Sequence, residues 1–117
     1  MGKLSTHVLD TMHGVPAQGV RIDLYLVQDG QRQLLGHAVT NHDGRCDQPL
    51  LQGADFTRGV YELVFHAGDY FAARGVQAAE PRFVDEVALR FGVADPGQNY
   101  HVPLLVTPWT WSTYRGS

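Results

Sequence analysis

Short runs of alternating apolar and polar residues dominate the chain. The clearest run places apolar side chains at every second position from Val20 to Leu26. Alternation with a period of two is typical of a strand with one buried face. Asp29-Gly30 follows as a turn signal, so residues 34–40 are predicted to return as the second strand of a hairpin. Further strands are predicted at residues 4–11, 61–65, 83–91, 100–106 and 109–114.

Only one stretch of the chain suits a helix. Asp69 is expected to act as its N-cap, residues 70–74 contain two alanines, and Gly75 ends the run. The helix can therefore hold at most about two turns. Seven or eight strands, separated by turn signals at intervals of about 8–12 residues, and one short helix predict an antiparallel β-sandwich.

The length of 117 residues predicts a single domain spanning 1–117, by the prior of about 100–200 residues per domain. The formal net charge is −3, so no basic excess points to nucleic acid or to an anionic membrane surface. Charged residues make up 18% of the sequence, against about 25% in average globular proteins. A low charge density leaves more apolar surface, which favours a subunit interface.

Cys46 is the only cysteine, so a disulfide framework is excluded and a reducing compartment is favoured. No apolar stretch approaches the length of about 18 residues needed to span a bilayer. Neither a signal-peptide pattern nor a peroxisomal tripeptide is present, and these observations predict a cytoplasmic protein. Cys46 itself is expected to be a small buried apolar residue; the alternative is a thiolate with a low pKa beside Arg45.

Six histidines are the main candidates for chemistry: His7, His13, His37, His42, His66 and His101. A single histidine on a strand is more typical of a half-buried hydrogen-bonding residue than of a catalyst. No HxH or HExxH spacing predicts a zinc site, no glycine-rich loop predicts phosphate binding, and no GxSxG elbow predicts a hydrolase serine. The residue pattern alone therefore predicts a β-sandwich without a metal or cofactor, and no function.

Three segments add a resemblance to a known family. They are LSTHVLD at 4–10, TNHDGRC at 40–46, and residues 91–117, which end in Tyr114-Arg115-Gly116-Ser117. Together they resemble the 5-hydroxyisourate hydrolases, the transthyretin-related enzymes of purine catabolism. The resemblance runs from residue 4 to residue 117. The terminal tetrapeptide is its most specific piece, because the hormone-carrying transthyretins lack it.

This resemblance implies a transthyretin-like sandwich of two four-stranded sheets with one short helix, assembled as a homotetramer with active sites at the dimer–dimer interface. It implies hydrolysis of 5-hydroxyisourate to 2-oxo-4-hydroxy-4-carboxy-5-ureidoimidazoline in urate degradation, without a cofactor. The catalytic residues implied are His7, Arg45, His101 and Ser117. The substrate-binding residues implied are His7, Arg45, Tyr114, Arg115, Gly116 and Ser117.

These residue types suit the opening of a cyclic amide. A neutral imidazole can take a proton from water, and a second can protonate the leaving nitrogen. Arginine stays cationic and can stabilise negative charge on a carbonyl oxygen. Which histidine is the base stays open, as does the choice between the Ser117 hydroxyl and its terminal carboxylate. The alternatives are a carrier of small ligands without catalysis, and a metal-binding protein that uses His7 and His101 from several subunits.

Overall fold

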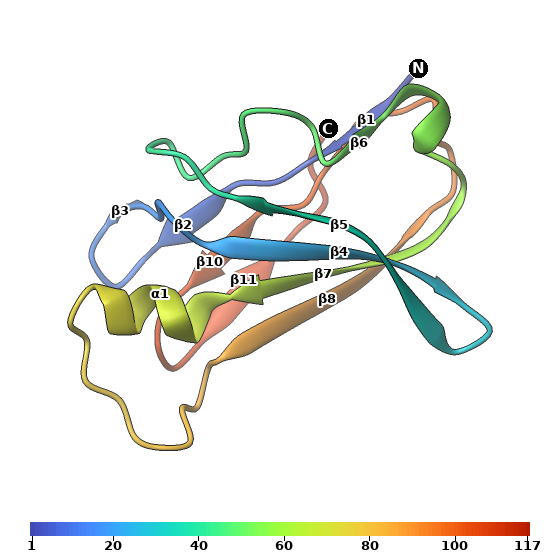
Figure 1. Cartoon of the computed structure of the whole chain (residues 1–117). Helices are drawn as coiled ribbons and strands as arrows, with labels where there is room; N and C mark the ends of the chain where they lie inside the picture. The colour runs from blue at the N-terminus through green and yellow to red at the C-terminus, as the bar shows by residue number, and fades with distance from the viewer.

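The computed structural model describes all residues from Met1 to Ser117 as two layers of strands, with one α-helix beside them (Figure 1). The strands are β1 (Lys3–Ser5), β2 (Val8–Asp10), β3 (Val15–Pro16), β4 (Arg21–Gln28), β5 (Gln31–Val39), β6 (Leu51–Gln52), β7 (Gly59–His66), β8 (Glu86–Val93), β9 (Tyr100–His101), β10 (Leu104–Val106) and β11 (Trp111–Thr113). The helical elements are the 3-10 turn η1 (Gly53–Asp55) and the helix α1 (Ala67–Ala73).

The first layer is an antiparallel sheet in the order β5-β4-β7-β8. The β4–β5 hairpin confirms the turn predicted at Asp29-Gly30, where the two residues have positive φ values of 52° and 75°. Positive φ at both central residues matches the twist of the strands that a two-residue loop joins. Ile22 and Leu24 of β4 are buried in the core, as the alternation predicts, and Asp23 between them is buried as well.

The second layer is interrupted part of the way along its strands. β1 pairs with β9 and β2 with β10, both in parallel, while β6, β3 and β11 add antiparallel outer strands. The breaks fall at Thr6-His7 and Val102-Pro103, where Pro103 has no N–H to donate to the ladder. Read through the break, the layer has four strands. The predicted sandwich of two four-stranded sheets is therefore confirmed, with two parallel pairings that turn signals did not indicate.

The core lies between the two layers and draws on both. Its largest fully buried apolar side chains are Tyr61, Phe65, Leu4, Ile22, Leu63 and Leu104. Tyr61, Phe65 and Ile22 come from the first layer, whereas Leu4 and Leu104 come from the two halves of the second. Both halves of the interrupted layer are thus held against one core, and the break between them does not loosen the sandwich.

The helix begins earlier than the sequence predicts. His66 is its N-cap and Asp69 lies in its first turn, so the assignment of Asp69 as N-cap is wrong. Strand β7 runs directly into the helix, and the Gly68 N–H donates a hydrogen bond to the Asp85 carbonyl (3.0 Å). This bond satisfies one of the free N–H groups of the first turn without a side-chain cap. No helix here has the length and apolar character that a membrane crossing requires.

Strand β8 starts later than the alternation predicts. It begins at Glu86, which pairs with His66 at the end of β7. Beyond His66 the chain turns into α1, so no partner strand is available for the residues before Glu86. Phe83, predicted as the first residue of this strand, is 83% exposed. The alternating pattern in the sequence extends beyond the residues of β8 that pair with β7, because a sequence pattern does not show where the neighbouring strand ends.

A buried carboxylate joins α1 to the second layer. Asp10 is 1% exposed and accepts hydrogen bonds from the Tyr70 hydroxyl (2.7 Å) and the His13 backbone N–H (2.9 Å). Burial raises the pKa of Asp10, but the hydrogen bonds outweigh burial and hold this pKa below its ordinary value. Such a carboxylate stabilises the fold fully above its unfolded pKa, about 3.9, and the stabilisation is lost as the pH falls through the lower folded pKa.

We expect Asp10→Ala to lower the free energy of unfolding by about 1–3 kcal/mol, because the buried Tyr70 hydroxyl loses its acceptor. Urea unfolding followed by circular dichroism at pH 7 measures this loss. The gap between the wild type and the variant should narrow as the pH falls below about 3.9. Asp55→Ala, at an exposed position in η1, is the matched control and should change stability by less than about 0.5 kcal/mol. Equal stability of the two variants would contradict the role given to Asp10.

Candidate active site

Two histidines lie at the break in the second layer. His7 follows β1 and His101 ends β9. The parallel register aligns Ser5 with His101 and brings the two imidazoles to a ring-centroid separation of 6.4 Å, with their planes tilted by 46°. Both side chains are half-buried. Two predicted catalytic residues from opposite ends of the chain therefore lie side by side.

Arg45 is held beside His7 by the loop that connects β5 to β6. The two residues form an isolated antiparallel bridge, and the Val8 N–H donates to the Gly44 carbonyl (2.8 Å). Gly44 has a φ of 75°, and a Cβ there would collide with the Val8 carbonyl oxygen, so the approach requires glycine. The Asn41 side-chain oxygen accepts a hydrogen bond from the Arg45 N–H (3.2 Å), and the Asn41 N–H donates to the Arg45 carbonyl (2.7 Å). Asn41 was absent from the predicted site, although its place before the Asp-Gly turn was a local signal.

The charge of Arg45 acts on both imidazoles. Burial lowers the pKa of His7, and Arg45 lowers it further. Burial also lowers the pKa of His101, with added contributions from Arg45 and His7. Loss of water and a neighbouring cation both disfavour a second positive charge. Two neutral imidazoles near a permanent cation can therefore exchange protons with a bound molecule at neutral pH.

His101 is fixed through its backbone and through its ring. Its N–H donates to the Gly116 carbonyl (3.1 Å), and the Gly116 N–H donates to the His101 carbonyl (2.7 Å). A Cβ on Gly116 would lie 3.3 Å from the Cβ of His101, so glycine lets the tail lie close against this residue. The Nδ1 atom of His101 lies 2.9 Å from the Ser5 hydroxyl. Ser5 was also missed, although its position two residues before His7 was an available signal of strand parity.

The C-terminal tail is anchored by Arg115. Its guanidinium lies 4.2 Å from the centroid of the Tyr100 ring and donates hydrogen bonds to the Gln98 side chain (3.1 Å) and the Asn99 carbonyl (3.2 Å). Within one protomer, the predicted substrate-binding residue Arg115 is thus engaged with its own chain. This anchor holds Gly116 at the position where it meets His101.

Tyr114 and Ser117, the other predicted tail residues, do not join the histidine cluster in the same way. Tyr114 is 60% exposed, and Ser117 is exposed at the end of the chain. Of the tetrapeptide, only Gly116 forms a bridge with His101. The structure therefore brings His7, Arg45, His101 and Gly116 together directly, and leaves the rest of the tail at the surface.

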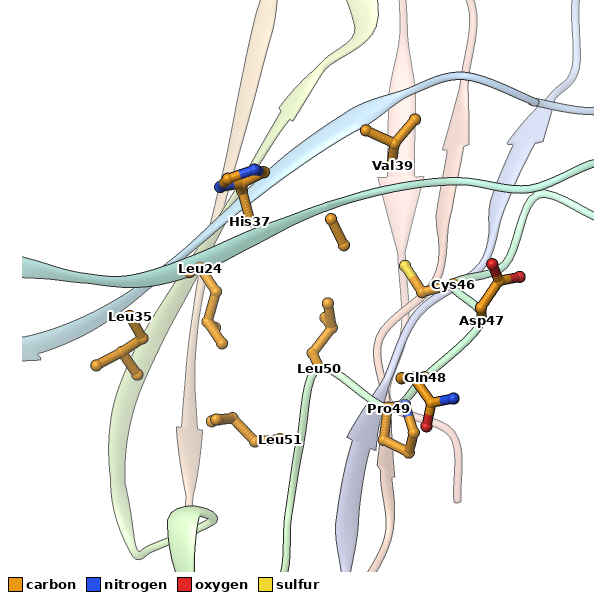
Figure 2. A pocket seen from close by; sticks show the side chains of 12 residues that line it. Leu24, Leu35, His37, Val39, Cys46, Asp47, Gln48, Pro49, Leu50 and Leu51 are labelled. Atoms are coloured by element: carbon orange, nitrogen blue, oxygen red, sulfur yellow. The ribbon is translucent and has the colours of Figure 1, made fainter.

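Cys46 follows Arg45 directly in the same loop. It is partly buried against the core and lines a cavity of about 310 Å³ that Leu24 and Leu50 also line (Figure 2). Burial raises the pKa of the Cys46 thiol, and neighbouring Asp47 raises it further. The partly buried thiol packs against the core as the predicted small apolar residue would, and the direction of its pKa disfavours the alternative of a low-pKa thiolate. Neither imidazole of the histidine pair lines this cavity.

The other four histidines lie outside the cluster. Three of them lie near carboxylates: the His13 ring lies 2.6 Å from Asp10, the His66 ring 2.8 Å from Asp23, and the His42 ring 3.4 Å from Asp43. His37 and His42 are exposed. No group of three or more His, Cys, Asp or Glu side chains in the protomer is arranged to hold a metal ion.

Comparison of the sequence with known proteins identifies close relatives. A family model described as HIUase/Transthyretin family matches residues 4–116. The 5-hydroxyisourate hydrolase of Pseudomonas aeruginosa is 61% identical over 117 residues, which cover 100% of this chain and 93% of that protein. The 5-hydroxyisourate hydrolase of Ralstonia nicotianae is 55% identical over the full length of both chains.

Solved structures extend the comparison to the fold. The 5-hydroxyisourate hydrolase of Klebsiella pneumoniae superposes with a TM-score of 0.81 at 34% identity, over 100% of both chains. An (S)-allantoin synthase gives a TM-score of 0.94 at 48% identity over 99% of this chain, which spans only 44% of that longer protein. Sea bream transthyretin in complex with thyroxine gives 0.86 at 23% identity, covering 97% and 94% of the two chains. The last likeness shows the fold alone, and the predicted transthyretin-like sandwich is confirmed.

Proposed function

The chain belongs to the HIUase/Transthyretin family, and from this premise we propose that it hydrolyses 5-hydroxyisourate in urate degradation. The product is 2-oxo-4-hydroxy-4-carboxy-5-ureidoimidazoline. The observation that carries the proposal is the cluster of His7, Arg45 and His101, in which both imidazoles have lowered pKa values beside a cation. Hydrolase relatives at 61% and 55% identity support the same activity. The single-domain boundaries and the cytoplasmic location expected from the sequence stay predictions.

The reaction is the addition of water to a cyclic amide. One imidazole takes a proton from water while the water oxygen bonds to the ring carbonyl carbon. The carbonyl oxygen becomes negative and is stabilised by the Arg45 guanidinium. The carbon–nitrogen bond then breaks, and the second imidazole gives a proton to the leaving nitrogen. The first imidazole passes the proton that it took from water to the second, so both rings end neutral, as they began. The two imidazoles, His7 and His101, divide the base and acid roles, so no cofactor is required for proton balance.

The tail completes the site. We assign Ser117 to catalysis through its hydroxyl or its terminal carboxylate, either of which can orient water or an imidazole. We assign Tyr114, Arg115 and Gly116 to substrate binding along with His7 and Arg45. The bridge of Gly116 to His101 and the anchoring of Arg115 on Tyr100 support this placement, because they bring the end of the chain to the imidazole pair.

The working form is proposed to be a homotetramer with sites at the dimer–dimer interface. Large aromatic side chains near the tail support this proposal: Trp109, Trp111 and Tyr114 are 60%, 42% and 60% exposed. Exposed apolar area of this kind is typical of an interface. Light scattering should give four times the protomer mass of 12.9 kDa. A mass of one protomer at micromolar concentration would contradict the proposed homotetramer.

A carrier without catalysis is the second candidate. It shares the fold, since the thyroxine complex of sea bream transthyretin superposes well on this chain. A binding channel for an apolar ligand, however, gains nothing from two imidazoles and a guanidinium gathered at one point, because these groups lose hydration when an apolar molecule covers them. The histidine–arginine cluster therefore favours the enzyme.

The direct test follows the substrate. Urate is oxidised in situ to give 5-hydroxyisourate, and its ultraviolet absorbance is recorded with and without the protein. We expect decay faster than the spontaneous rate, in proportion to protein concentration. Decay at the spontaneous rate, with thyroxine-like ligands binding tightly, would instead support the carrier.

A further inference from the structure

Ser5 makes a contact to the site that the proposed function does not use. Ser5 ends β1 and lies opposite His101 of β9 in the parallel register. Its hydroxyl oxygen lies 2.9 Å from Nδ1 of His101. The backbone of Ser5 is occupied separately, since its carbonyl accepts a hydrogen bond from the Val102 N–H (2.9 Å). The hydroxyl is therefore the group on Ser5 that acts on the imidazole.

The direction of this hydrogen bond decides the tautomer of His101. A serine hydroxyl can donate to a ring nitrogen or accept from it, and the nitrogen takes the complementary role. A neutral imidazole that accepts at Nδ1 carries its proton on Nε2.

We propose that Ser5 is a positioning residue that holds His101 as the Nε2–H tautomer, so that His101 donates the proton to the leaving nitrogen and His7 takes the proton from water. The inference rests on the proposed function for the roles of the two imidazoles. The tautomer itself rests on the Ser5–His101 geometry alone.

The first test reads the tautomer without any substrate. Two-bond ¹H–¹⁵N correlation spectra of uniformly labelled protein at pH 8 distinguish protonated from bare ring nitrogens for each histidine. Assignment comes from the His101→Gln and His7→Gln variants. We expect a protonated Nε2 and a bare Nδ1 for His101. A protonated Nδ1 on His101 overturns the proposal, whether or not the protein hydrolyses 5-hydroxyisourate, so this result is separate from failure of the proposed function.

The second test compares three variants in the 5-hydroxyisourate assay. Ser5→Ala should lower kcat by about 10–100-fold, the range found when a partner that orients a metal-bound histidine is removed, with a smaller change in KM. Ser5→Thr keeps the hydroxyl and should restore most of kcat and the wild-type His101 spectrum. Thr11→Ala removes a comparable hydroxyl bond, to the Val106 carbonyl, and should leave kcat unchanged.

Three results would overturn the role of Ser5: wild-type kcat in Ser5→Ala, equal loss in Ser5→Ala and Ser5→Thr, or an unaltered His101 tautomer in Ser5→Ala. If Ser5→Ala fails to fold, the spectrum of the wild type and the kcat of Ser5→Thr still decide the question. Rescue by threonine would not follow from a merely structural role, because threonine changes the shape of the side chain while keeping its hydroxyl.

Discussion

Replacement of Arg45 by alanine is expected to lower kcat/KM for 5-hydroxyisourate by about 10²–10³-fold, the usual effect of removing a donor to a developing oxyanion. Arg45 reaches this position because the Gly44 approach to Val8 and the two Asn41 hydrogen bonds hold its backbone beside His7. Steady-state rates of substrate decay measure the loss. Circular dichroism should remain that of the wild type, since Arg45 is exposed and outside the core.

The same substitution should also change the pH profile. Arg45 lowers the pKa of both His7 and His101, so its removal raises both values. The base acts only when neutral, and the acidic limb of the profile should therefore move to higher pH. Arg45→Lys retains the charge but not the planar fork of donors. It should keep the position of the acidic limb while losing much of the rate. An unshifted limb in Arg45→Ala would contradict the electrostatic role.

Deletion of Arg115, Gly116 and Ser117 should abolish measurable hydrolysis while the sandwich stays folded. The deletion removes the two backbone hydrogen bonds between Gly116 and His101, together with the terminal group assigned to catalysis. A displacement of a catalytic group by about 1 Å can lower the rate by about 10²-fold. In the deletion variant, His101 loses both of these backbone hydrogen bonds. The substrate-decay assay measures activity, and urea unfolding checks the fold.

A finer series separates the parts of the tail. Arg115→Ala removes the contact with Tyr100 and the bonds to the 98–99 loop, and it should give a partial loss that reflects a mobile tail. Gly116→Val brings side-chain carbon against His101, whose Cβ would lie 3.3 Å from a Cβ at residue 116, and it should be the more damaging of the two. Full activity in the deletion variant would show that the tail has no part in the reaction.

Local pattern was sufficient for much of the fold. Alternation from Val20 to Leu26 predicted a strand that the structure confirms as β4, and Asp29-Gly30 predicted its hairpin. These features depend on neighbours a few positions apart, where backbone preference and burial of one face decide the outcome. The errors have a shared cause. The sequence predicts Asp69 as an N-cap and residue 83 as a strand start, because a local pattern does not show how far the neighbouring strand β7 runs.

The candidate site likewise contains residues that the sequence predicts and residues that only the structure reveals. His7, Arg45 and His101 were reached through resemblance of whole segments to a family, not through spacing, since the three are far apart in the chain. Ser5 and Asn41 lie within the matched segments 4–10 and 40–46, but the resemblance assigns them no role, and each matters only through what it contacts. Ser5 meets His101 because β1 and β9 lie in parallel register, and Asn41 meets Arg45 because a loop closes on itself.

Residue order thus decided which strands, turns and reactive side chains exist, because those depend on short-range preferences and on side-chain chemistry. Only the tertiary structure decided which of these strands and side chains lie next to one another. Pro103 leaves a gap in the ladder of the second layer, the break places two imidazoles 6.4 Å apart, and the tail returns to lie against one of them. Proton affinities follow from that arrangement, since burial and the charge of Arg45 lower the pKa of both histidines only once packing has brought them together.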